Sequence, residues 1–132
     1  MTDDWLPTAD QPEAQAELCQ QICRAADLSR PGLKHAALPM EQEPRSWSLR
    51  LEVRDGQGQR LQREDLELEL YGSAVDPSLQ LGWLYQQEQP LLWQGRHPVW
   101  MDASSGARCE RPEGGMALET LARRLRAQLV GG

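Results

Sequence analysis

The chain has 132 residues, the size of one ordinary domain, and 39% of them are hydrophobic and 26% charged. This balance excludes wholesale disorder. Twenty acidic residues against fourteen basic ones give a net charge of −6, and such an average field repels duplex nucleic acid and anionic membrane surfaces.

The first residues have neither the basic start nor the apolar stretch of a secretory signal. No apolar run approaches the ~18–20 residues that are needed to cross a bilayer. The three cysteines are an odd set, whereas secreted disulfide frameworks usually have an even one. We therefore expect a cytoplasmic protein with reduced thiols and no membrane association.

A helix is predicted to begin at Asp10, because its carboxylate can accept hydrogen bonds from free amides and Pro12 is tolerated in a first turn. Glu13, three residues after Asp10, strengthens this start signal. Apolar residues recur at helical spacing over 18–26. The segment 29–32, Ser-Arg-Pro-Gly, is predicted to end the helix.

The clearest signal in the chain is the strict alternation over 46–54, which predicts a strand with one buried face and one wet face. The preceding segment, 31–45, holds three prolines and is predicted to be a connection that crosses the domain. Asp-Gly-Gln-Gly at 55–58 is typical of a hairpin turn. The returning strand is predicted at 66–71, after a bulge or break near 63–65.

Opposite charges on the wet faces favour this pairing. Arg50 and Arg54 lie on one strand, and Glu67 and Glu69 lie on the other. Each cross-strand pair of this kind stabilises a sheet by roughly 0.2–1 kcal/mol. The dry faces should be buried together: Trp47, Leu49, Leu51, Val53, Leu66, Leu68 and Leu70, with Leu121 and Leu125 against them.

Alternation resumes over 79–85 and predicts a third strand. A fourth strand is predicted to begin at 91–93, and Gly-Arg-His-Pro at 95–98 interrupts it. Residues 99–101 either continue that strand or form a separate short one. From Met116 onward the leucines recur at helical spacing, which predicts an amphipathic helix.

Together these elements predict an α+β fold: an N-terminal helix, a four- to five-stranded antiparallel sheet, and a C-terminal amphipathic helix packed on one face of the sheet. Residues 1–9 are predicted to be a flexible lead-in, and 10–132 a single α+β domain.

The three cysteines are candidate metal ligands. Cys19 and Cys23 lie four residues apart on the first helix, and with Cys109 and His97 they could complete a tetrahedral zinc site. The short spacing of a zinc knuckle is missing, so buried structural thiols are favoured. No metal site is predicted.

Catalytic signatures are also missing. His97 is followed by Asp102 and two serines, yet no nucleophile elbow or other triad context accompanies it. The carboxylate pair Glu64-Asp65 lacks the apolar context that would raise a pKa, and we interpret it as solvated charge. We predict no catalytic residue and no cofactor.

The segment 83–100 is the most unusual one, since it gathers three tryptophans, a tyrosine, an arginine and a histidine. Exposed Trp beside Arg is typical of interface hot spots, while a core that uses Trp in a chain without Phe is the competing interpretation. Pro98 cannot donate to a sheet ladder, which confines this stretch to an edge or a break. We predict a partner-binding surface made by Trp93, Arg96, His97 and Trp100.

The leading hypothesis is a non-enzymatic cytoplasmic protein-binding module: an assembly factor, adaptor, chaperone-like or immunity-type protein with a protein partner. The alternative is a small-molecule-binding regulator or minor enzyme, with a pocket near Trp83, Trp93, His97 and Cys109. A weaker third hypothesis is RNA association through three arginines of the last helix, which the acidic composition disfavours. These arginines are Arg123, Arg124 and Arg126.

Overall fold

The structure is a computed structural model, and it describes residues 6–43, 45–72 and 76–131. Helix α1 (Pro12–Ser29) precedes all the strands and helix α2 (Gly115–Gly131) follows them. Between them lie β1 (Leu33–Glu43), β2 (Ser46–Asp55), the short 3-10 helix η1 (Gln62–Glu64), β3 (Leu66–Tyr71), β4 (Ser78–Trp83), β5 (Leu91–Gln94), β6 (Pro98–Met101) and β7 (Arg108–Cys109). Within these described ranges, no helix is long and apolar enough to span a membrane.

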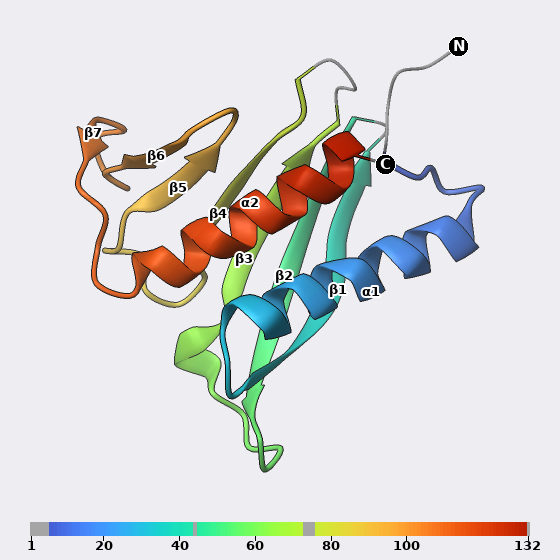
Figure 1. Cartoon of the computed structure of the whole chain (residues 1–132), viewed down its shortest axis with the longest axis horizontal. Coiled ribbons are helices and arrows are strands. Elements are labelled where there is room, and N and C mark those ends of the chain that lie inside the picture. The colour runs from blue at the N-terminus through green and yellow to red at the C-terminus, as the bar shows by residue number, and fades with distance from the viewer. Residues whose placement is uncertain (1–5, 44, 73–75, 132) are drawn as a thin grey trace.

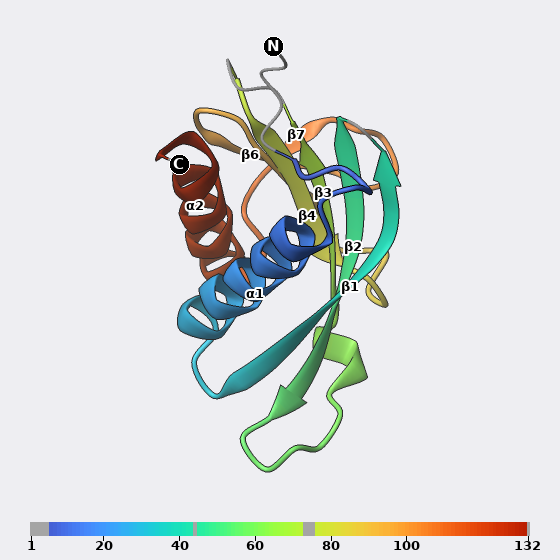
Figure 2. The same cartoon turned by 90° about the vertical axis from the view of Figure 1, so that its right-hand side faces the viewer.

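The strands form one antiparallel sheet in which the strand order β1 to β7 repeats the order in the sequence. Both helices lie on the same side of this sheet, so that the molecule has two layers (Figures 1 and 2). The α+β class is therefore as predicted. The described residues form seven strands, and the predicted four to five is wrong.

One missed strand is β1, which occupies the segment predicted to be a connection. Its prolines suggested irregular structure, but β1 is an edge strand, and only one side of its backbone has to join a ladder. Pro39 lies opposite Leu49, and the register shifts immediately after it. The other missed strand, β7, has two residues, which is too short for any periodicity to be visible.

The free edge of β1 has few backbone donors to offer. The His35 N–H donates to Asp27 Oδ1 of α1 at 2.9 Å. The backbone of Ala37 hydrogen-bonds the Cys23 thiol, also on α1. Pro39, the next residue of the same parity before the register shift, has no N–H. Helix α1 and one proline thus protect this edge against pairing with another strand.

The core lies between the sheet and the helices, and it contains the residues of β2 and β3 that the alternation predicted to be buried. They are Trp47, Leu49, Leu51, Val53, Leu66, Leu68 and Leu70, all at most 1% exposed. Leu121 and Leu125 of α2 are equally buried, at 0% and 2%. Leu6 also joins this core, with 3% of its surface exposed.

The ends of α1 agree with the sequence in part. The helix begins at Pro12, but its N-cap residue is Gln11 and no side chain caps the first turn, so the capping role predicted for Asp10 is wrong. Asp10 instead accepts a hydrogen bond from the Thr8 hydroxyl. The helix ends at Ser29 as predicted, where the Ser29 hydroxyl donates to the carbonyl of Ala25 at 2.8 Å.

The structure also shows where the other predicted strands begin and end. The break near 63–65 is the 3-10 helix η1. Strand β4 ends at Trp83, so that Tyr85 lies beyond it and is 47% exposed. Residues 98–101 form a strand of their own, β6. The segment between β3 and β4 lies partly outside the described residues.

Candidate functional site

The face of the sheet opposite the helices carries side chains that neither helix covers, and we call it the open face. Across β3 to β6 it presents an apolar patch of half-buried side chains, namely Tyr71, Leu91, Trp93, Val99 and Met101. The register holds this patch together, because Trp93 lies directly opposite Val99, and Leu91 opposite Met101. Cross-strand neighbours of this kind lie about 4.5–5.5 Å apart at Cβ.

Two details show how the patch is packed. The Tyr71 and Trp93 rings contact each other across the intervening strand, with centroids 5.6 Å apart and planes tilted by 38°. Leu91 leans over Gly82 of β4, where any Cβ would lie 2.6 Å from Leu91 Cδ2. Gly82 therefore leaves the space that the apolar patch uses.

The predicted site residues do not lie on one surface. Trp93 is on the open face, and Arg96 and His97 are exposed in the turn between β5 and β6. Trp100 lies on the helix side, is 5% exposed and stacks on Trp83 with centroids 6.3 Å apart. Its Nε1 donates to Glu119 Oε2 of α2 at 2.7 Å. The surface placement of Trp100 is thus corrected: it belongs to the core.

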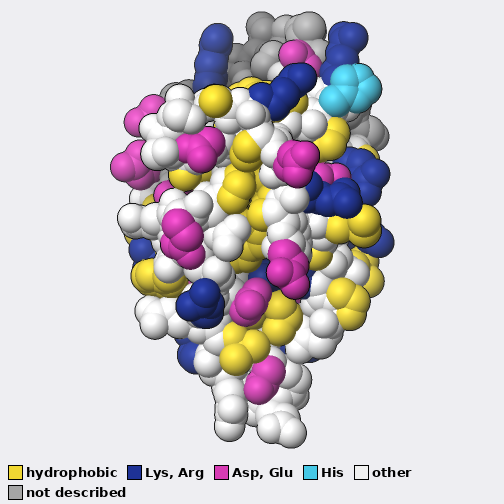
Figure 3. Space-filling model, turned by 90° about the vertical axis from the view of Figure 1, so that its left-hand side faces the viewer, with side chains coloured by type: hydrophobic (Ala, Val, Ile, Leu, Met, Phe, Trp, Pro, Cys, Tyr) yellow, Lys and Arg dark blue, Asp and Glu magenta, His cyan; other side chains and the backbone are white. Residues whose placement is uncertain are grey.

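Pro98 lies at a position where the lack of a backbone N–H removes no hydrogen bond to β7. Strand β7 pairs with Trp100 and Met101 of β6 and stops there. Pro98 and Val99 extend beyond the end of β7 at the edge of the sheet, in agreement with the expectation that Pro98 marks an edge. On the side of the molecule that carries β6 and β7, a band of hydrophobic side chains runs between acidic ones (Figure 3).

An acidic groove adjoins the apolar patch. It has a volume of about 330 Å³, and three carboxylates line it, those of Glu41, Glu67 and Glu69. Tyr71 belongs to both features, because it lines the groove and contacts Trp93. Burial and the hydrogen bond that its hydroxyl donates to Glu69 raise the pKa of Tyr71 to about 12, so this hydroxyl stays protonated.

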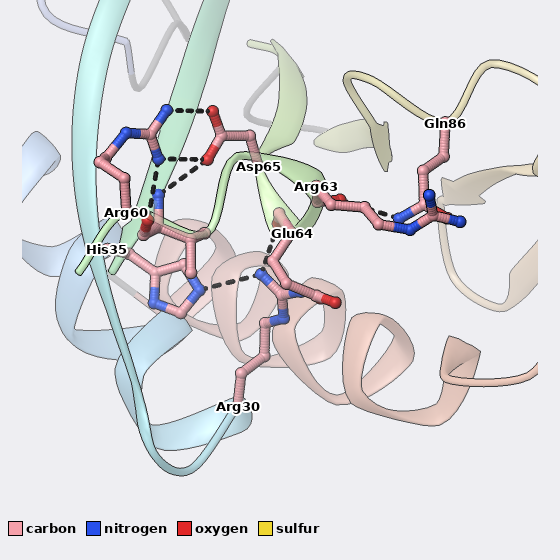
Figure 4. A network of polar contacts seen from close by, with 8 residues as sticks. Arg30, His35, Arg60, Arg63, Glu64, Asp65 and Gln86 are labelled. Carbon is pink, nitrogen blue, oxygen red and sulfur yellow. Dashed lines mark hydrogen bonds and ion pairs between the residues drawn. The ribbon is translucent and has the colours of Figure 1, made fainter. Parts of the chain in front are cut away.

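A polar network lies at the other end of the sheet (Figure 4). The buried His35 ring contacts Asp27 through Nδ1 at 2.9 Å and Arg30 through Nε2 at 3.1 Å. Arg30 also donates to Glu64 Oε2 at 2.5 Å. Burial lowers the pKa of His35, although Asp27 opposes that effect. The neutral ring thus donates to Asp27 and accepts from Arg30, which leaves no free nitrogen for general base catalysis.

Asp65 corrects the prediction that the Glu64-Asp65 pair is solvated charge. Its side chain has no exposed surface, and it accepts two hydrogen bonds from Arg60, both at 2.8 Å. The Val53 backbone N–H donates to Asp65 Oδ1 as well, at 2.9 Å. Burial acts to raise the pKa of Asp65, but these donors outweigh it and the pKa is lowered. This carboxylate joins β2 to the start of β3.

The cysteines are not brought together as a set of ligands. Cys19 and Cys23 are half-buried on α1, and burial raises the pKa of both thiols. Cys109 is on β7, at the opposite edge of the sheet from β1. In the described ranges, no group of three or more His, Cys, Asp or Glu side chains could hold a metal ion.

The residues of the alternative small-molecule pocket are separated by the sheet. Trp83 stacks on Trp100, and Cys109 lies opposite Trp100, so both are on the helix side. Trp93 is on the open face, directly opposite Val99. His97 lies in the turn between β5 and β6. These four residues cannot line one pocket.

The acidic groove and the continuous open face were missed at the sequence level. Glu41 belongs to β1, which carried no strand signal, and only the register places it in one row with Glu69, on the other side of Ser48. The alternation around Glu67 and Glu69 did indicate that both are on a wet face. The signal for the other strand was hidden by its prolines.

A protein-family model matches residues 19–128 of the chain, and it describes a domain of unknown function (DUF8659). The match extends from α1 to α2 and so includes every strand that forms the open face. No curated protein and no solved structure matches the chain.

Proposed function

The chain belongs to the DUF8659 family, and we propose that this domain is a protein-binding module whose binding surface is the open face. The observation that carries the proposal is the asymmetry of the sheet. One face is covered by α1 and α2, while the other carries a packed patch of half-buried aromatic and aliphatic side chains that neither helix covers. Contiguous apolar patches on a protein surface mark interaction sites.

The composition of the patch supports a protein partner. Trp and Tyr are enriched among the residues that dominate binding at protein interfaces, and Arg is enriched with them. Trp93 and Tyr71 are already packed against each other, so little side-chain freedom is lost when a partner docks on them. Arg96 and His97 stand exposed at the end of the same hairpin and can donate to partner carbonyls.

A cytoplasmic location is part of this proposal. The three cysteines of the chain are all free thiols, which is typical of proteins kept in a reducing compartment. Assembly factors, adaptors, chaperone-like proteins and immunity-type proteins all match such a module. The buried His35 is not available as a general base, because both of its ring nitrogens are occupied by structural partners.

The test separates surface from core. We expect Trp93→Ala to abolish capture of a stoichiometric partner from native lysate, with roughly 2 kcal/mol or more of binding energy lost and little change in melting temperature. Tyr85→Ala removes an exposed aromatic ring beyond the end of β4 and serves as the matched control. Trp100→Ala should instead lower the stability by about 3–5 kcal/mol. Unchanged capture by a folded Trp93→Ala variant would remove the open face from consideration.

A further inference from the structure

We propose that the open face binds a segment of a partner protein that combines basic residues with apolar ones. Its Lys or Arg side chains enter the acidic groove, and its apolar side chains cover the patch around Trp93. This inference rests on the proposed function and adds the chemistry of the partner to it.

The register joins the two features into one row across the sheet. Directly opposed residues run from β1 to β6 in the order Glu41, Ser48, Glu69, Gln80, Trp93 and Val99. Acidic side chains are at the β1 end of this row and apolar ones at the β6 end. At about 4.8 Å per strand spacing, the row extends over about 24 Å. An extended segment of about seven residues spans that distance.

The negative charge of the groove favours binding of the basic residues of the partner segment. Its three carboxylates, from Glu41, Glu67 and Glu69, are accompanied by serines and aromatic residues, and no basic residue is among the residues that line it. Arg50 lies across from Glu67 on the adjacent strand and balances part of this charge. The chain as a whole carries a net charge of −6, which steers a basic partner toward it and repels an acidic one.

The aromatic residues connect the two halves of the proposed site. Tyr71 lines the groove while its ring contacts Trp93, so a cation in the groove also lies close to an aromatic face. Since the pKa of Tyr71 is about 12, its ring carries no charge of its own at neutral pH. The neighbouring Leu91 and Met101 extend the apolar surface toward the β7 edge.

A second copy of this chain is a poorer occupant. Two open faces in contact would bring two sets of the same groove carboxylates together, and the residues that line the groove include no basic one to pair with them. Strand addition at the first half of β1 is disfavoured as well, because Asp27 and Cys23 occupy the outward donors of His35 and Ala37, and Pro39 has no donor. A basic and apolar segment from another protein satisfies both halves of the row.

The experiment selects random displayed peptides of about ten residues, the length that spans the row, on the full chain. The affinity of the selected peptides is then measured by fluorescence anisotropy. The variants are Glu67→Gln/Glu69→Gln for the groove and Trp93→Ala for the patch. The matched control is Glu13→Gln/Glu17→Gln, which removes the same charge from exposed positions on α1, on the helix side of the sheet.

We expect enriched peptides to combine Lys or Arg with apolar residues. Their affinity should fall about tenfold in the Glu67→Gln/Glu69→Gln variant, stay unchanged in the α1 control, and weaken for the unaltered chain as salt is raised. The opposite result would be acidic or uncharged peptides whose affinity is unchanged in the Glu67→Gln/Glu69→Gln variant but is abolished by Trp93→Ala. That result would overturn the inference of a basic partner and would leave the proposed function standing.

Two other outcomes would contradict more than the basic character of the partner. Selection that yields no peptide, or peptides indifferent to both the groove and the Trp93 variants, counts against the proposed function and against this inference. A homodimer by light scattering that Trp93→Ala dissociates would assign the open face to a second copy. The salt titration on the unaltered chain keeps the charge argument testable if the double Gln variant is destabilised.

Discussion

The side chain of Asp65 has no exposed surface, and three hydrogen-bond donors keep its carboxylate ionised. Arg60 binds both of its oxygens, and the Val53 N–H approaches one of them. A carboxylate buried in this way stabilises the fold only while it is ionised and paired. Its folded pKa is lowered relative to the unfolded chain, so this stabilisation is present above the unfolded pKa of about 3.9 and is lost as the pH falls through the folded pKa.

Asp65→Asn should lower the free energy of unfolding at pH 7 by about 2–4 kcal/mol, because Arg60 and the Val53 amide lose an anionic acceptor. The variant should also lose less stability than the wild type when the pH is lowered below 4. Urea unfolding at a series of pH values measures both effects. Glu52→Gln is the control, since Glu52 is part-exposed and lies 3.7 Å from Arg60, a geometry worth about 0–1 kcal/mol. Equal effects of the two variants would contradict this assignment.

At the scale of elements, β1 shows how a long edge strand avoids pairing with other chains. It has eleven residues, and an unprotected edge of that length is a template for aggregation. Its outward donors at His35 and Ala37 are taken up by α1. Pro39 removes a further donor at the cost of a register shift in the strand.

Pro39→Thr should restore a backbone donor on this edge and increase self-association. Thr also has a higher β-propensity than Pro, so the monomer itself should keep its fold. Dynamic light scattering at matched concentrations measures the average size, which should grow over time relative to wild type. Pro31→Thr is the control: it changes an exposed proline just outside the strand and should leave the average size unchanged. Identical sizes for both variants would show that the proline does not guard the edge.

Much of the fold could be predicted from the elements with strong periodicity. Strands β2 and β3 and helix α2 bury one side, so their apolar residues recur at the spacing of a strand or a helix. The signal fails at the edges of the sheet, where β1 has only His35 buried and β7 has two residues. A strand that buries little apolar surface carries little periodicity.

The candidate site was harder to predict, because it depends on how the chain turns between β5 and β6. Trp93 is opposite Val99, and Gln94 is opposite Pro98, so the neighbouring Trp100 has to face the other side of the sheet. A turn with one residue more or fewer would have placed Trp100 on the same face of the sheet as Trp93. The sequence alone does not specify the length of that turn, which is why the predicted surface includes both tryptophans.

At the scale of the whole molecule, the polar network around His35 joins three separate elements. Arg30 follows the last residue of α1 and bonds His35 of β1 and Glu64 of η1. Burial keeps the pKa of His35 below that of an exposed histidine. Because the unfolded chain takes up this proton below about pH 6.5 while the folded chain does not, stability falls as the pH decreases from 6.5 toward the folded pKa.

The melting temperature should therefore decrease between pH 7 and pH 5, and His35→Gln should flatten that decrease while lowering stability at pH 7. His97→Gln is a matched control, because His97 is exposed in the turn between β5 and β6. Thermal unfolding followed by circular dichroism across this pH range distinguishes the two. If the His97 variant flattens the profile instead, the pH sensitivity does not arise from the buried network.

The meander order of the sheet has a consequence for how the chain matures on the ribosome. Each strand pairs with the one synthesised just before it, so hairpins can form during translation at low contact order. Helix α1 is available early and packs on β1, whereas β4 and β5 are covered by α2, which emerges after every strand. Until residues 115–131 have been synthesised, the apolar face of β4 and β5 is not covered by a helix and stays exposed to solvent. That interval is when a nascent chain of this topology most needs a chaperone.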